Sequence, residues 1–309
     1  MNGWDAALTA GAGLLAGGVN AIAGGGTLIA FPALLAAGLP AVTANITSST
    51  GLVTGYAGGA LGYRRELAGQ AARLRALGPP AVAGGVVGAV ILLVTPGGAF
   101  KAAVPFLVLL SCALLASQTK LGAFVARRRA ARAASLATNP IAAPAAAGAA
   151  VAASSVEDAR VAAHAVVQAP AAAAGSARAD PGDGAPVAAQ PVTWPTRAGV
   201  FLAGVYGSYF GAGLGVLLLG VLGVLLVDDL QRTNALKTLL SFIVNAVGVV
   251  IFLASAQVAW AYAGILVVAS AIGGVLGARV ARRLPAKALR AGVITLGVTV
   301  AVVLLIRDI

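Results

Sequence analysis

Long apolar segments alternate with short polar stretches along the chain, and they fall into two groups of four with a polar middle between them. The first group comprises Ala6–Gly38, Val42–Tyr63, Leu77–Val94 and Ala102–Leu121. The second comprises Ala198–Val227, Thr233–Ala254, Val258–Ala278 and Ala288–Ile306. Each segment has the roughly 17 or more residues that a helix needs to cross the hydrocarbon core of a bilayer. The pattern predicts an all-α, polytopic integral membrane protein.

Composition excludes most other classes of protein. Hydrophobic residues make up 60% of the 309 residues and charged residues only 10%, whereas a soluble domain carries about 25% charged residues. The single cysteine and the single histidine exclude an intramolecular disulfide and any metal site that needs two imidazoles. We therefore expect no enzyme, no metal and no cofactor.

The polar middle of the chain separates two membrane units. Residues 130–195 are rich in Ala and Pro and contain almost no large apolar side chain, so they cannot bury enough surface to offset the entropy of ordering. We expect residues 1–129 to form a first membrane repeat, residues 130–195 a disordered cytoplasmic linker, and residues 196–309 a second membrane repeat.

The two groups of segments are related by internal repetition. The run Gly84–Ala89 recurs 189 residues later as Gly273–Ala278, and at the same offset Asn45 falls on Asn234. Three glycines of the first segment, at positions 17, 24 and 26, fall on glycines of the fifth at an offset of 187. This ordered series predicts two copies of one structural unit.

Basic residues indicate how the two copies are oriented. The chain has 21 Lys and Arg against 9 Asp and Glu, a net charge of +12, and short loops rich in Lys and Arg stay in the cytoplasm. The first copy carries its basic cluster between its second and third segments, and the second copy between its third and fourth segments. The two repeats are therefore expected to be inverted relative to each other.

Inversion requires an odd number of crossings per repeat, although each repeat has four apolar segments. The first segment of each repeat is interrupted by glycines, and we predict that it is a re-entrant or discontinuous helix. The N-terminus, Lys101 and Arg307 then lie outside, Lys237 lies in the membrane and the other 18 basic residues lie inside. The alternative is eight straight crossings with the N-terminus inside. That arrangement places the basic cluster at 279–290 on the outer side of the membrane.

The interrupted segments predict a binding site. Backbone that is not helical is tolerated at membrane depth only where protein or a water-filled cavity satisfies it, and a half-helix beginning after such a break directs free N–H groups at the gap. Hydroxyl and amide residues at the start of the second segment of each repeat add side-chain donors. The expected substrate-binding residues are Asn20, Gly24, Gly25, Gly26, Thr27, Asn45, Thr47, Ser48, Gly211, Gly213, Asn234, Lys237 and Thr238. Tyr206 and Tyr209 are weaker candidates, and Asn245 is expected to make an interhelical hydrogen bond.

The stretch Ala16–Leu28, followed by Phe31–Leu34 and Ala44–Thr47, resembles the opening of the sulfite exporter TauE/SafE family. The runs Gly204–Gly213 and Leu276–Arg279 agree with the second half of that family. The resemblance covers both membrane repeats but not residues 130–195. It implies an integral membrane transporter for small anions, typically sulfite, thiosulfate or sulfonated organic acids. Where many relatives have more glycine in the second break, this chain has Ala212 and Leu214.

We expect a secondary transporter that moves a small sulfur-containing or carboxylated anion across the cytoplasmic membrane by alternating access between the repeats. A passive anion channel, and a membrane scaffold that recruits partners through its basic cytoplasmic loops, are the alternatives. The expected partners are the anion and membrane lipid, with a homo-oligomer permitted and nucleic acid excluded.

Overall fold

The computed structural model describes residues 2–22, 25–137, 192–226, 230–254, 258–280 and 286–307, and within these ranges the regular structure is helical. Its helices are α1 (Gly3–Ile22), α2 (Thr27–Ala36), α3 (Ala41–Gly62), α4 (Ala71–Val94), α5 (Gly97–Ala137), α8 (Trp194–Tyr209), α9 (Leu214–Leu225), α10 (Leu230–Ala254), α11 (Trp260–Val280) and α12 (Ala286–Arg307). Residues 1–122 and 190–309 form one compact unit, and residues 123–189 form a second. The predicted all-α fold is confirmed for the described residues.

Three stretches of the described helices are long and apolar enough to cross a membrane: Ala71–Val94, Gly97–Ser117 and Arg232–Ala254. Four shorter apolar helical stretches accompany them: Thr27–Ala36, Leu214–Leu225, Trp260–Gly274 and Ala291–Ile306. Helix α3 has a comparable length of 22 residues, but its threonines, serines and glycines lower its mean hydropathy.

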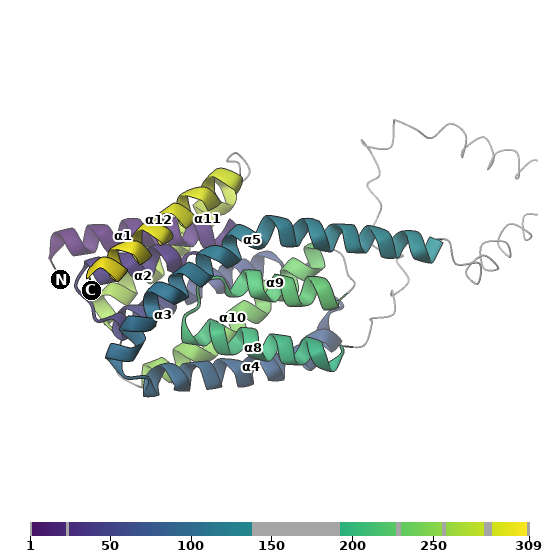
Figure 1. Ribbon diagram of the computed structural model, residues 1–309, viewed down its shortest axis with the longest axis horizontal. Coiled ribbons are helices and arrows are strands. Elements are labelled where there is room, and N and C mark those ends of the chain that lie inside the picture. Colours follow the sequence, from purple (N-terminus) through teal and green to yellow (C-terminus); the bar gives the residue numbers. More distant parts are fainter. Residues whose placement is uncertain are drawn as a thin grey trace, which may run out of the picture. The chain divides into compact units, whose positions relative to one another are not determined.

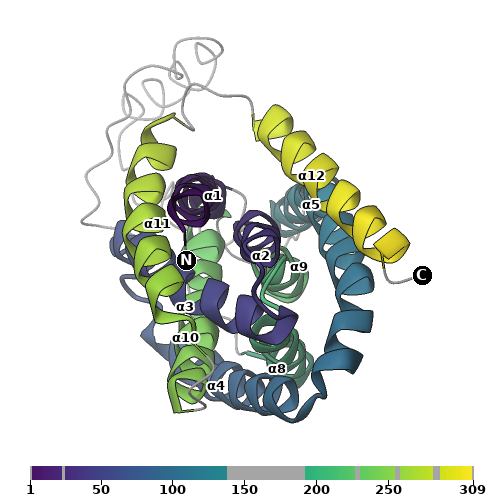
Figure 2. The ribbon, with the colours of Figure 1, turned by 90° about the vertical axis from the view of Figure 1, so that its left-hand side faces the viewer.

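Two helix pairs in the larger unit approach each other closely through glycine. Helix α4 packs along α8, and α1 packs along α11 (Figures 1 and 2). A methyl group on Gly84 of α4 would collide with the carbonyl oxygen of Phe201 of α8, and one on Gly273 of α11 would collide with the carbonyl oxygen of Leu14 of α1. Only glycine allows backbones to approach this closely.

The short helices α2 and α9 lie at the centre of the larger unit, with longer helices around them (Figure 2). Most of their side chains are buried, including Thr27, Leu28 and Phe31 of α2 and Leu214, Leu218 and Leu222 of α9. A short helix that is buried almost all round is core rather than surface.

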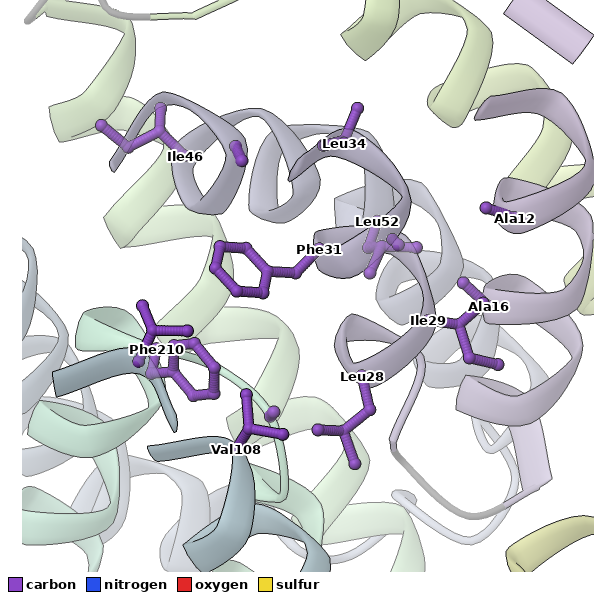
Figure 3. Packing of buried hydrophobic residues seen from close by; sticks show 14 of the residues in the cluster. Ala12, Ala16, Leu28, Ile29, Phe31, Leu34, Ile46, Leu52, Val108 and Phe210 are labelled. Carbon is purple, nitrogen blue, oxygen red and sulfur yellow. The ribbon is translucent and has the colours of Figure 1, made fainter. Parts of the chain in front are cut away.

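Apolar side chains from both halves of the sequence form the core around α2 (Figure 3). The rings of Phe31 and Phe210 meet edge to face, with centroids 5.5 Å apart. Leu28 and Val108 lie below them in the same cluster (Figure 3). A second cluster joins α4, α8, α9 and α10 through residues that include Leu77, Leu214 and Leu240. The site described next lies beside the Phe31–Phe210 contact.

Several predicted boundaries differ from the helix bounds, including the end of the linker, since α8 begins at Trp194. Helix α5 continues through Ala137, so residues 130–137, which we assigned to the disordered linker, are helical; their alanine and arginine are strong helix formers. Helix α4 begins at Ala71 rather than at Leu77, so Arg73 and Arg75 belong to its first turns rather than to a loop.

Candidate functional site

Helices α8 and α9 are separated by a short non-helical connection, and Gly25 and Gly26 directly precede α2 without belonging to it. Helix α1 ends at Ile22 and α2 begins at Thr27, with Gly26 at its N-cap; we call Gly25 and Gly26 the first break. Helix α8 ends at Tyr209 and α9 begins at Leu214, and residues 210–213 are the second break. Both Gly211 and Gly213 have positive φ, at 81° and 83°, which explains why glycine occupies these two positions.

The two breaks lie against each other although 184 residues separate them in the sequence. A methyl group at Gly211 would lie 3.7 Å from Oγ1 of Thr27. Phe31, in the second turn of α2, contacts Phe210 of the second break. Thr27 is 4% exposed and Gly211 is also buried, so the contact between the breaks lies in the interior of the protein.

A polar cluster lies at the first break. The side chains of Asn20, at the end of α1, and Thr27, at the start of α2, both lie close enough to the Tyr56 hydroxyl of α3 to interact with it. Oδ1 of Asn20 is buried and has no hydrogen-bond partner. Hydroxyl and amide groups therefore converge at the N-terminus of α2, where the backbone N–H groups of Leu28 and Ile29 donate to the carbonyl oxygens of Gly25 and Gly26.

The second break has a different set of neighbours. The Tyr206 hydroxyl donates a hydrogen bond to the carbonyl oxygen of Ala212 at 2.8 Å. Oγ of Ser111 in α5 lies 2.7 Å from that hydroxyl and 3.1 Å from the same carbonyl oxygen. These two side chains hold the peptide that precedes Gly213, and they thereby fix the start of α9.

Helix α3 connects to the second break through Asn45, which is fully buried. Nδ2 of Asn45 donates to the carbonyl oxygen of Tyr209, the last residue of α8, at 2.9 Å. This bond fixes the orientation of the amide and turns Oδ1 away from Tyr209, and that oxygen has no hydrogen-bond partner. A buried acceptor without a donor is costly, so it marks a place where water or another hydrogen-bond donor can bind.

The chain matches the model of the family described as "Sulfite exporter TauE/SafE" over residues 9–304. The chain belongs to this family. Neither the curated proteins nor the solved structures include a match to it. Membership of the TauE/SafE family makes the chain a multi-pass membrane transporter for a small anion rather than an enzyme.

Several of the expected TauE/SafE site residues come together at the breaks. Asn20, Thr27 and Asn45 lie there as described above, and Gly25, Gly26, Gly211 and Gly213 are buried in the breaks themselves. Gly24 lies outside the described residues.

Other expected residues have their hydroxyls bonded elsewhere. Oγ1 of Thr47 accepts a hydrogen bond from the backbone N–H of Ala259 at 3.1 Å, between α10 and α11. The Ser48 hydroxyl donates to the carbonyl of Asn45, and the Thr238 hydroxyl donates to the carbonyl of Asn234. Asn234 and Lys237 are half-buried on the first turns of α10.

Two residues of the site, Tyr56 and Ser111, were not among the candidates from the sequence. Tyr56 follows Asn45 by 11 residues, which places both on one face of α3; this spacing was the available signal. Ser111 lies in the apolar run of α5 with no sequence signal of its own.

Proposed function

We propose that this TauE/SafE protein is a secondary transporter that moves a small oxyanion across the cytoplasmic membrane by alternating access. The observation that carries the proposal is the junction of the two breaks at Thr27 and Gly211. Two half-helices, α2 and α9, begin at this junction, and the N-terminus of a helix favours negative charge. Buried hydroxyl and amide groups of Asn20, Tyr56 and Asn45 lie beside it.

The chemistry of the site favours small anions such as sulfite, thiosulfate, and sulfonated or carboxylated organic anions. Each of these carries oxygens that accept hydrogen bonds from N–H and O–H donors. We propose that Lys237, on the first turns of α10, supplies positive charge to the anion.

We further propose that the two halves are inverted repeats. Each half packs one of its later helices, α4 or α11, against the first helix of the other half, α8 or α1. Leu14 and Phe201 are equivalent at the offset of 187, and Gly84 and Gly273 are equivalent at the offset of 189. The contact of Gly84 with Phe201 is thus the counterpart of the contact of Gly273 with Leu14. Reciprocal contacts of this kind are what a pseudo-twofold axis produces.

Topology provides a test of the inverted repeats. Reporter fusions at Gly97 and Ser255 are both expected to give an extracytoplasmic signal, because the inverted arrangement places both points outside. A fusion at Arg64 serves as the cytoplasmic control. A cytoplasmic signal from either Gly97 or Ser255 contradicts the arrangement.

Flux in proteoliposomes tests the function. We expect saturable uptake of sulfite, thiosulfate or a small sulfonate that depends on the protein. Lys237→Ala is expected to reduce the transport efficiency about tenfold, because a charge-assisted hydrogen bond is worth about 1.5–3 kcal/mol. Lys237→Arg keeps the positive charge and is expected to retain most of the transport efficiency. Lys101→Ala, at the exposed start of α5, is the control and should leave flux unchanged. Flux that never saturates indicates the passive channel instead, and no flux of any of these anions contradicts the proposal.

A further inference from the structure

Helix α10 carries a row of polar side chains along one face. Asn234, Thr238, Ser241 and Asn245 follow one another at intervals of four, three and four residues, the spacing that aligns side chains on one side of a helix. We call these four residues the α10 polar face. The row extends from the basic end of the helix, at Arg232 and Lys237, into its middle.

The inner half of the α10 polar face is buried and incompletely hydrogen-bonded. Ser241 is 2% exposed and Asn245 is 5% exposed. Neither Oγ of Ser241 nor Oδ1 of Asn245 has a hydrogen-bond partner. The interhelical hydrogen bond that we expected for Asn245 is therefore not made by its side-chain oxygen. Buried polar atoms normally find partners, and two unpartnered atoms one turn apart indicate a ligand or solvent that supplies them.

The rest of α10 is used for packing. Leu236, Leu240 and Val244 belong to the apolar cluster shared with α4, α8 and α9. At its outer end the polar face lies beside α3, because a methyl group at Gly59 of α3 would lie 3.1 Å from Cγ2 of Thr238. The polar residues thus face neither the apolar cluster nor the exposed side of the helix at Val250, which is 68% exposed.

The equivalent face of α3 is the one that lines the candidate site. At the offset of 189, Asn234 corresponds to Asn45 and Asn245 corresponds to Tyr56. Asn45 bonds the end of α8 at the second break, and Tyr56 lies beside Asn20 and Thr27 at the first break. The α10 polar face is therefore the repeat-related counterpart of the face of α3 that lies at the candidate site, and the two helices pack against each other.

We propose that the α10 polar face lines the path along which the anion moves between the cytoplasmic side and the breaks, with Ser241 and Asn245 as its innermost contacts. The hydroxyl and amide groups there offer both donors and acceptors to a partly hydrated oxyanion. This inference rests on the proposed transport function and assigns residues to its route.

Thiol accessibility tests the path. Cys112 is the single cysteine of the chain, so a Cys112→Ser background allows one cysteine at a time to be placed on α10. Ser241→Cys and Asn245→Cys are treated in proteoliposomes with an impermeant, negatively charged methanethiosulfonate. Val244→Cys, in the apolar cluster, and Val250→Cys, on the exposed side, are the controls on the same helix.

We expect both path cysteines to react at least tenfold faster than either control, and we expect sulfoacetate to slow their reaction. Sulfite itself is avoided as the protecting anion because it attacks the reagent. Equal rates at all four positions, or no reaction at the path positions, overturn the inference. Ser241→Cys changes a single atom and carries the test alone if Asn245→Cys does not remain monodisperse in detergent.

Flux of the unmodified protein, measured in parallel, separates this inference from the proposed function. If sulfite flux is present and the path cysteines do not react, the path is wrong while the function stands. If the path cysteines react selectively and no anion flux is found, the path stands and the proposed substrates are wrong.

Discussion

Gly84→Ala is expected to lower the midpoint of thermal unfolding by about 4–8 °C, because a methyl group there meets the backbone carbonyl of Phe201 and neither helix can move aside without losing its packing. This corresponds to about 2 kcal/mol of the free energy of unfolding. Size-exclusion chromatography of detergent-purified protein after heating measures the midpoint.

The same helix supplies the control. Gly78 of α4 has no atom of another helix within 4 Å of the position of a Cβ, so Gly78→Ala should lower the midpoint by much less than Gly84→Ala; any effect comes from the strain of a Cβ before Pro79. The reciprocal pair on α11 is expected to behave alike, with Gly273→Ala destabilising and Gly264→Ala neutral. Equal midpoints for Gly84→Ala and Gly78→Ala would contradict the close helix crossing.

Thr27→Val is expected to reduce transport efficiency at least tenfold with little change in stability. Valine has nearly the shape of threonine, but it removes the hydroxyl that lies beside Tyr56 and that faces Gly211. A buried donor or acceptor left without its partner costs about 1–3 kcal/mol, and about 1.4 kcal/mol corresponds to a tenfold change. The initial rate of anion uptake into proteoliposomes is the measurement.

Two variants show whether the hydroxyl itself matters. Thr27→Ser keeps the hydroxyl and should retain most of the uptake. Thr50→Val makes the same substitution at a buried threonine whose hydroxyl bonds only to Ile46 of its own helix, and it should transport normally. Normal uptake by Thr27→Val would remove Thr27 from the site.

The helices were largely predictable from the sequence because apolar length fixes a membrane helix almost by itself. The third segment illustrates this, since its predicted end at Val94 is where α4 ends. Its start was predicted six residues too late. Arg73 and Arg75 are charged and were therefore assigned to a loop, but arginine is also a strong helix former, and both lie in the first turns of α4.

The site was predictable in its residue types but not in its contacts. Glycine clusters in the sequence coincide with the positions where α1 and α8 end. That Thr27 meets Gly211 depends on tertiary packing between residues 184 positions apart, which no local pattern encodes. Thr47 shows the converse, since its position suggested substrate contact while its hydroxyl accepts from Ala259.

The two breaks occupy equivalent positions in the two repeats, but their side chains differ in polarity. At the offset of 187, Thr27 corresponds to Leu214 and Asn20 to Gly207, so the polar cluster at the first break has an apolar counterpart at the second. There, Tyr206 and Ser111 bind the carbonyl of Ala212. We infer that the first break supplies side-chain contacts to the anion and that the second supplies a fixed backbone.

Counterflow tests the central claim, that the anion is carried between two alternating states of one site, most directly. Proteoliposomes are loaded with unlabelled sulfite and diluted into a trace of labelled sulfite, and the label inside is followed with time. The account predicts a transient accumulation of label above its equilibrium level, which disappears in Thr27→Val. Label that rises only to equilibrium, at a rate independent of the sulfite inside, would contradict it.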